Sequence, residues 1–152
     1  PGTTLLLCGV GEQTEMLQAL AKELDIAENV LFLGFRGDVS TLLGAADVFL
    51  FPSLQEGLPV SLMEAMAAGL PCVVSDVRGS EDLIHPGEGG YLCAPGDVDG
   101  LADGLRTLLS DPPQREAMGQ RNRETVKAYA LPHVREHMAA LYQGQLAREE
   151  AR

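Results

Sequence analysis

The stretch FLFPSLQEGLPVSLMEAMAAGLPCVVSD, from Phe49 to Asp76, predicts a strand, a helix and a second strand in succession. Apolar runs over 47–53 (DVFLFPS) and 71–76 (PCVVSD) have the length and composition of buried strands. Between them, Pro59 to Ala68 predicts a helix, because proline suits the first turn and Gly69 suits the end. Two continuous apolar strands joined by a helix favour a parallel sheet covered on both faces.

The same alternation continues on both sides of this stretch. Further strands are predicted over 3–9, 29–34 and 89–95, and further helices over 12–26, 38–46, 80–84, 97–111, 112–130 and 132–152. We therefore predict the α/β class, with a Rossmann-like doubly wound parallel sheet of about five strands followed by C-terminal helices. The length of 152 residues predicts one domain over residues 1–152.

The charge of the chain restricts what it can bind. The net charge is −11, which argues against nucleic acid as a partner. Up to Leu105 there are only three cations, Lys22, Arg36 and Arg78, against sixteen acids. An anion bound by this part of the chain must therefore be held mostly by backbone amides and helix N-termini.

The cysteines and the hydropathy pattern suggest where the protein works. Cys8, Cys72 and Cys93 each lie in an apolar run, which predicts three buried, reduced thiols in a cytoplasmic protein. No apolar run reaches the ~18 residues that a membrane span requires. No spacing of Cys or His indicates a metal site, since His133 and His137 have no acidic residue to complete one.

Ligands of doubly wound sheets bind beyond the carboxyl ends of the strands. In this chain those ends are followed by glycine-containing loops, two of which carry a scarce arginine: Gly9–Gly11, Gly34–Gly37 with Arg36, Ser53–Pro59, and Ser75–Ser80 with Arg78. Each glycine alone is also explained by a tight turn, and each arginine alone by an exposed charge. The run GVGEQT is a poor dinucleotide fingerprint, because Thr14 replaces the third glycine.

Two carboxylates accompany the helix of the opening stretch. Glu56 precedes the helix, and Glu64 lies within it on one stripe with Ser61. We expect so apolar a helix to be packed on most sides, so that Glu64 is buried and needs hydrogen-bond donors. Those donors come either from the protein or from a ligand with paired hydroxyls, such as a ribose.

The backbone between the two carboxylates suits an anion. The amides of Gly57, Leu58, Val60 and Ser61 lie at or near the helix N-terminus, where phosphates bind. A nucleoside diphosphate-sugar would occupy the whole of this site. Its phosphates would bind the amides, and its hydroxyl groups would donate hydrogen bonds to the two carboxylates.

The run from Phe49 to Ile84 resembles the signature of the group 1 retaining glycosyltransferases, which have the GT-B fold. Two glutamates spaced as Glu56 and Glu64 are that family's hallmark, and LLLCGVGEQ and VLFLGFRGDV lie upstream at the family's usual distances. The resemblance implies the C-terminal, donor-binding domain of a two-domain enzyme. It also implies transfer with retention of configuration, with no metal in this domain and no cofactor besides a nucleotide-sugar, favoured to be a UDP-sugar, as substrate.

The resemblance also assigns roles to residues. Glu64 would hold the ribose hydroxyls, and Glu56 would be the catalytic residue that faces the donor sugar and phosphates. The remaining donor-binding residues fall into two groups. Gly57, Leu58, Pro59, Val60 and Ser61 would lie at the diphosphate, and all of these except the proline would donate amides to it. Gly9, Gly11, Gly34, Phe35 and Arg36 would lie in the loops of the first two strands, the second of which meets the base.

Two departures from the family pattern matter. Pro59 stands where many members have glycine, which removes one amide and resembles polysaccharide-assembling members. The family's diphosphate-neutralising Arg and Lys, the first strand of this domain and the acceptor domain would lie upstream of Pro1. We therefore expect the isolated chain to bind donor weakly, to catalyse nothing and to associate with itself, since the strands at 3–8 and 47–51 would each lose a neighbour.

The upstream domain would bind the glycan or lipid-linked acceptor and would provide any association with a membrane. Two other functions remain open. One is a non-catalytic, nucleotide-binding regulatory module, and the other is a scaffold whose sheet edge pairs with another chain.

Overall fold

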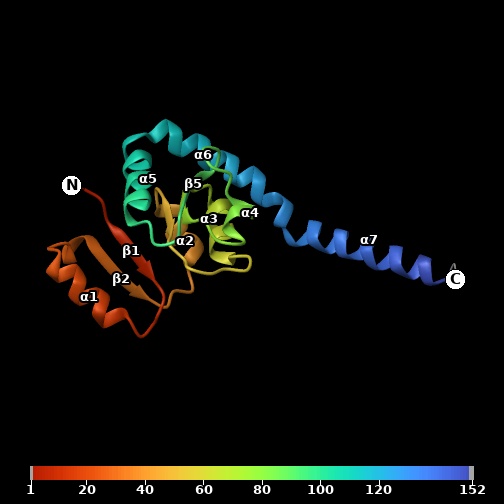
Figure 1. Cartoon of the computed structure of the whole chain (residues 1–152), viewed down its shortest axis with the longest axis horizontal. Coiled ribbons are helices and arrows are strands. Elements are labelled where there is room, and N and C mark those ends of the chain that lie inside the picture. Colours follow the sequence, from red (N-terminus) through yellow and green to blue (C-terminus); the bar gives the residue numbers. More distant parts are fainter. Residues whose placement is uncertain (1, 151–152) are drawn as a thin grey trace. The chain divides into compact units, whose positions relative to one another are not determined.

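A computed structural model of the chain describes residues 2–150 and confirms the α/β class with five strands (Figure 1). The elements follow the predicted order: β1 (Leu5–Cys8), α1 (Thr14–Glu23), η1 (Ala27–Asn29), β2 (Val30–Gly34), α2 (Val39–Ala45), β3 (Phe49–Phe51), α3 (Val60–Ala68), β4 (Cys72–Ser75), α4 (Ser80–Leu83), β5 (Gly90–Cys93), α5 (Val98–Ser110), α6 (Pro112–Val126), η2 (Lys127–Tyr129) and α7 (Leu131–Glu150). No helix among these is both long enough and apolar enough to cross a membrane.

The five strands form two parallel sheets rather than one. β1 pairs with β2, and β3, β4 and β5 pair in that order. The chain likewise divides into two compact units, one up to Val39 and one from Ser40 onward. One edge of β1 and one edge of β3 are unpaired among the described residues.

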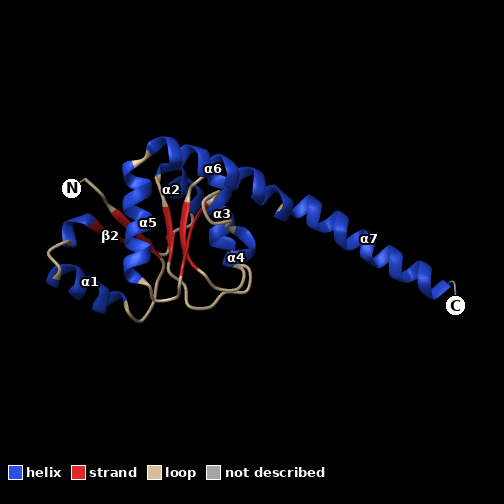
Figure 2. Cartoon of the chain, turned by 45° about the horizontal axis from the view of Figure 1, so that its top comes forward, coloured by secondary structure: helices blue, strands red, loops and turns tan. Residues whose placement is uncertain are grey.

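The second unit has its core on both sides of a three-stranded sheet. α5 contacts β4 and β5, while α3 contacts β3 and β4 from the opposite side (Figure 2). All four residues of the central strand β4 are buried, which is why its sequence is continuously apolar. The cluster on the α5 side consists of Val73, Leu101, Leu108 and Met118, and the α3 side buries Leu62, Ala65 and Met66.

Close backbone approach joins α3 to α6. Gly69 ends α3 in the left-handed region at φ 82°, as its position after the helix predicts. A Cβ added at Gly119 of α6 would overlap the Gly69 carbonyl oxygen. Glycine at 119 therefore allows α6 to pack directly on the C-terminal end of α3.

The first unit covers its apolar residues poorly. Met16, Leu17, Leu20 and Leu24 have the predicted helical spacing, yet all four are exposed. Two strands and one helix have too little surface to bury one another's apolar faces. The expectation of three buried cysteines is also wrong, because Cys8 is exposed and Cys93 is half-buried, and only Cys72 is buried. Burial raises the pKa of the Cys72 thiol and keeps it neutral.

Candidate functional site

The loop that joins β3 to α3 positions Glu56. The Ser53 hydroxyl donates a hydrogen bond of 2.7 Å to the Oε1 atom of Glu56, whose side chain is half-buried. This bond fixes one carboxylate oxygen and leaves the other without a partner among the described residues. Glu56 is therefore oriented at the end of β3, where the fold predicts a ligand.

The N-terminus of α3 presents backbone donors just beyond Glu56. Pro59 is the N-cap residue, so the helix begins one residue later than predicted. The first amide bonded within the turn is that of Met63, which donates to the Pro59 carbonyl at 3.2 Å. The preceding amides of Val60, Ser61 and Leu62 have no hydrogen-bond partner within residues 2–150. The amides of Val60 and Ser61 were predicted from the sequence, and that of Leu62 was not.

Glu64 is exposed, which corrects the expectation that it is buried. α3 buries its apolar side through Leu62, Ala65 and Met66, and the stripe that carries Glu64 turns outward. Its carboxylate accepts no hydrogen bond and forms no ion pair with any described residue. Protein donors therefore do not account for Glu64, and its carboxylate is accessible to a ligand one turn into the helix.

The loop between β4 and α4 completes this part of the site. Arg78 lines an open pocket of about 760 Å³ together with Gln55, Glu56 and Gly57. The next residue, Gly79, adopts φ 86°, and a Cβ there would overlap the Gly57 carbonyl oxygen and lie 3.2 Å from Cδ of Pro59. Arg78 and Glu56 thus belong to two loops that are packed directly on each other.

Gly79→Ala should separate these loops. We expect the free energy of unfolding to fall by about 2 kcal/mol, because the new methyl group both strains a left-handed backbone and displaces the Gly57 carbonyl. Gly87→Ala is the matched control, since Gly87 has φ 78° with no atom within 4 Å of an added Cβ, and should cost only about 1 kcal/mol. Chemical denaturation measures both, and equal losses would show that the contact with Gly57 does not matter.

The first unit brings together the predicted residues of its two strand ends. The Gly9 amide donates to the Gly34 carbonyl at 2.8 Å, and the two glycines adopt φ 135° and 61°. The Gly9–Gly11 and Gly34–Arg36 loops therefore start side by side at one edge of the β1–β2 sheet. Phe35 is 82% exposed on this edge, a position open to stacking with a planar ligand.

Arg36 is engaged within its own loop. Its Nε and Nη2 atoms donate to the two carboxylate oxygens of Asp38 at 2.8 and 2.6 Å. These hydrogen bonds raise the pKa of Arg36 and lower the pKa of Asp38. The family resemblance assigns Arg36, and not Arg78, to donor binding, but the Arg36 charge is already balanced by the Asp38 carboxylate.

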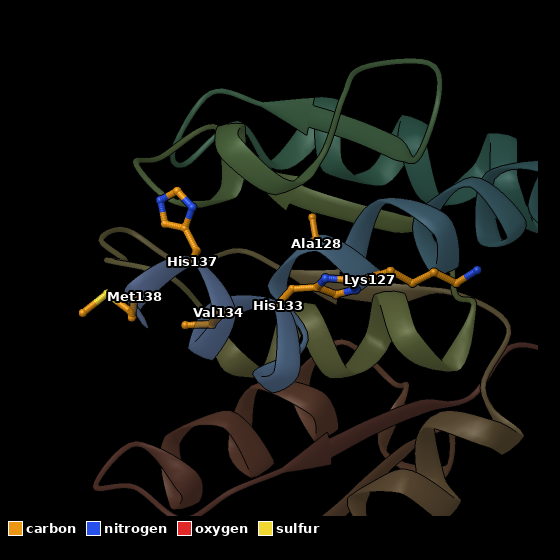
Figure 3. A pocket seen from close by; sticks show the side chains of 6 residues that line it. All are labelled: Lys127, Ala128, His133, Val134, His137 and Met138. Carbon is orange, nitrogen blue, oxygen red and sulfur yellow. The ribbon is translucent and has the colours of Figure 1, made fainter. Parts of the chain in front are cut away.

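A further hollow of about 550 Å³ lies where η2 meets α7 (Figure 3). His133 and His137 line it from α7 with their rings pointing in different directions, beside Lys127, Val134 and Met138. Within residues 2–150, no three His, Cys, Asp or Glu side chains lie close enough to hold a metal ion. Because the two rings point in different directions, His133 and His137 do not converge on one point of this hollow (Figure 3).

Comparison with known proteins covers most of the chain. The family model described as "Glycosyl transferases group 1" matches residues 1–125. The N-acetyl-alpha-D-glucosaminyl L-malate synthase of Bacillus anthracis is 42% identical over 122 residues, which make up 80% of this chain and 32% of that protein.

Two solved GT-B structures share the fold. Sucrose-phosphate synthase from Thermosynechococcus elongatus matches with a TM-score of 0.86 and 29% identity, over 95% of this chain and 39% of that one. HepE from Anabaena in complex with UDP-glucose matches with a TM-score of 0.88 and 26% identity, over 95% and 42% of the two chains. The chain thus spans 32% of the Bacillus relative and no more than 42% of these two structures.

Proposed function

Because the chain belongs to the group 1 glycosyltransferases, we propose that it is the donor-binding part of a retaining enzyme of that family. In this proposal, residues 1–152 form the C-terminal domain, and the donor is a nucleoside diphosphate-sugar, a UDP-sugar. The whole protein would transfer the sugar to a glycan or lipid-linked acceptor. The observation that carries the proposal is the row of three unpaired α3 amides between the accessible carboxylates of Glu56 and Glu64.

This row suits the parts of a nucleotide-sugar. The amides of Val60, Ser61 and Leu62, at the positive end of the α3 dipole, would bind the diphosphate. When the bond from the anomeric carbon to the phosphate oxygen breaks, negative charge grows on that diphosphate. Fixed amides directed at the charge would stabilise the transition state without reorganising.

The two carboxylates would bind hydroxyl groups on either side of the diphosphate. Glu64, exposed one turn into α3, would accept hydrogen bonds from the ribose. Glu56, held by Ser53, would face the sugar. The Gly34–Arg36 loop, with Phe35, would meet the base, and Gly9 and Gly11 would also belong to the donor-binding residues. The nucleotide-sugar enters as substrate, and the family resemblance is our basis for expecting neither a metal nor a further cofactor in this domain.

Glu64→Gln tests the ribose assignment. We expect UDP affinity to fall by about 1–3 kcal/mol, because a charged hydrogen-bond acceptor is replaced by a neutral one. Stability should barely change, since the side chain is exposed and has no partner among the described residues. Titration calorimetry of the natural protein that contains this chain measures the affinity. Glu116→Gln, an exposed glutamate on α6, is the control.

Unchanged UDP affinity in Glu64→Gln would contradict the proposal that Glu64 binds the ribose. A panel of UDP-sugars and acceptors then separates the transferase from the regulatory alternative. Turnover of any donor supports the transferase, whereas tight nucleotide binding without turnover of any donor would favour the non-catalytic module.

A further inference from the structure

Arg78 has no partner among the described residues, in contrast to the five cations from Arg106 to Lys127. From Arg106 to Lys127, every arginine and lysine donates to a carboxylate or to a backbone carbonyl. The pairs are Arg106 with Asp103, Arg115 with the Leu108 carbonyl, Arg121 with Glu88, Arg123 with the Ala68 carbonyl, and Lys127 with Glu124. The Arg78 guanidinium makes no hydrogen bond or ion pair with any side chain or backbone group that the structure describes.

The lack of a partner is unexpected in so acidic a region. Between Ser40 and Leu105, Arg78 is the only cation against ten acids. One of those acids, Glu56, lines the same pocket. Glu56 is nevertheless bonded to Ser53, and its carboxylate does not come within ion-pair distance of Arg78.

The backbone of Arg78 is held in place on both sides. Before it, the Asp76 amide donates to the Cys93 carbonyl at 2.7 Å. After it, the Ser80 amide donates to the Val77 carbonyl at 3.0 Å, and Gly79 lies against Gly57. A fixed loop therefore places a long cationic side chain at the pocket that it shares with Glu56 and Gly57, the residues that precede α3 in the chain.

We propose that Arg78 binds the diphosphate of the nucleotide-sugar, an inference that rests on the proposed function. Pro59 leaves the segment before α3 one amide short. A planar guanidinium with five N–H donors matches phosphate oxygens and keeps its charge at every working pH. Arg78 supplies, from the β4–α4 loop, the positive charge that the α3 amides lack, and so positions the leaving group.

Nucleotide titrations of the natural protein that contains this chain test the proposal. For Arg78→Met, UDP affinity should fall about ten- to thirtyfold, the range for loss of a hydrogen bond to a charged group. Uridine affinity should not change, because uridine has no phosphate, and UMP should show a smaller loss than UDP. Arg78→Lys should recover part of the UDP affinity. The control, Arg106→Met, removes the same charge from an exposed site on α5 and should leave UDP affinity unchanged.

The outcomes separate this inference from the proposed function. A wild-type protein that binds no UDP or UDP-sugar overturns the proposed function itself. Wild-type binding of UDP with equal affinity in Arg78→Met overturns only the role of Arg78. A loss for UDP-glucuronate but not for UDP or UDP-glucose also overturns it, because Arg78 would then bind a carboxylate of the sugar. An equal loss for UDP and uridine would show a general disturbance of the site and would likewise overturn it.

Discussion

Glu56→Ala is expected to lower turnover about a hundredfold, the scale of losing one group that stabilises a transition state, while UDP affinity changes much less. In the proposed function, Glu56 contacts the sugar and the reacting phosphate rather than the nucleoside. Its half-buried carboxylate is oriented by the 2.7 Å bond from Ser53. Steady-state kinetics with a UDP-sugar, beside calorimetric titration of UDP, measure the two effects separately.

Ser53→Ala provides a graded comparison. It keeps the Glu56 carboxylate and removes the bond that orients it, together with a longer contact of 3.4 Å to the Gln55 carbonyl. Turnover of Ser53→Ala should therefore lie between those of the wild type and Glu56→Ala. If UDP binding falls in Glu56→Ala while turnover per bound donor stays at the wild-type value, the role of Glu56 is wrongly assigned.

The second unit was predictable because its local signals agree with its packing. The apolar run at Cys72–Ser75 predicts a strand covered on both faces, and all four residues are buried. Asp97 caps α5 as its position suggests, with its Oδ1 accepting from the Gly100 amide at 2.9 Å. Gly69 ends α3 as expected. Such signals depend only on nearby residues, which the sequence shows directly.

Burial was harder to predict, because it depends on whether another element covers a face. The spacing of Leu17 and Leu20 correctly identifies the apolar side of α1, yet both residues are exposed in a unit of two strands. Glu64 shows the converse. Its apolar neighbours suggested a buried carboxylate, but α3 packs through one side only and leaves Glu64 accessible. Periodicity identifies a face without showing what lies opposite.

The candidate site was predictable as a set of loops but not as a set of contacts. The order of strands and helices places Glu56 and Arg78 at the ends of adjacent strands β3 and β4. Their shared pocket depends on the approach of Gly79 to Gly57, and the sequence gives no spacing that would reveal it. Arg36 was favoured for its loop, whereas its pairing with Asp38 depends on side-chain geometry.

Asn122 is a residue that the sequence analysis missed, because it lies in the charged run of α6 that predicts a solvent-facing helix. Its side chain is 1% exposed. The Nδ2 atom donates to the carbonyls of Leu70 and Gly89, each at 2.7 Å. A Cβ at Gly89 would overlap the Asn122 Oδ1 atom, so glycine there makes room for the amide. One buried side chain thus joins α6 to the segments that lead into β4 and β5.

Asn122→Leu should lower the free energy of unfolding by about 2–3 kcal/mol. The substitution removes two buried hydrogen bonds, each contributing about 1 kcal/mol. The Leu70 and Gly89 carbonyls then keep only the longer bonds from Sγ of Cys72 at 3.5 Å and from the Cys72 amide at 3.2 Å. Urea denaturation followed by circular dichroism measures the loss. The control is Gln120→Leu, an exposed position on the same helix, which should change stability by no more than about 0.5 kcal/mol. If Asn122→Leu were as stable as Gln120→Leu, the carbonyls of Leu70 and Gly89 would not depend on this amide, and α6 would be held to the sheet by its apolar contacts alone.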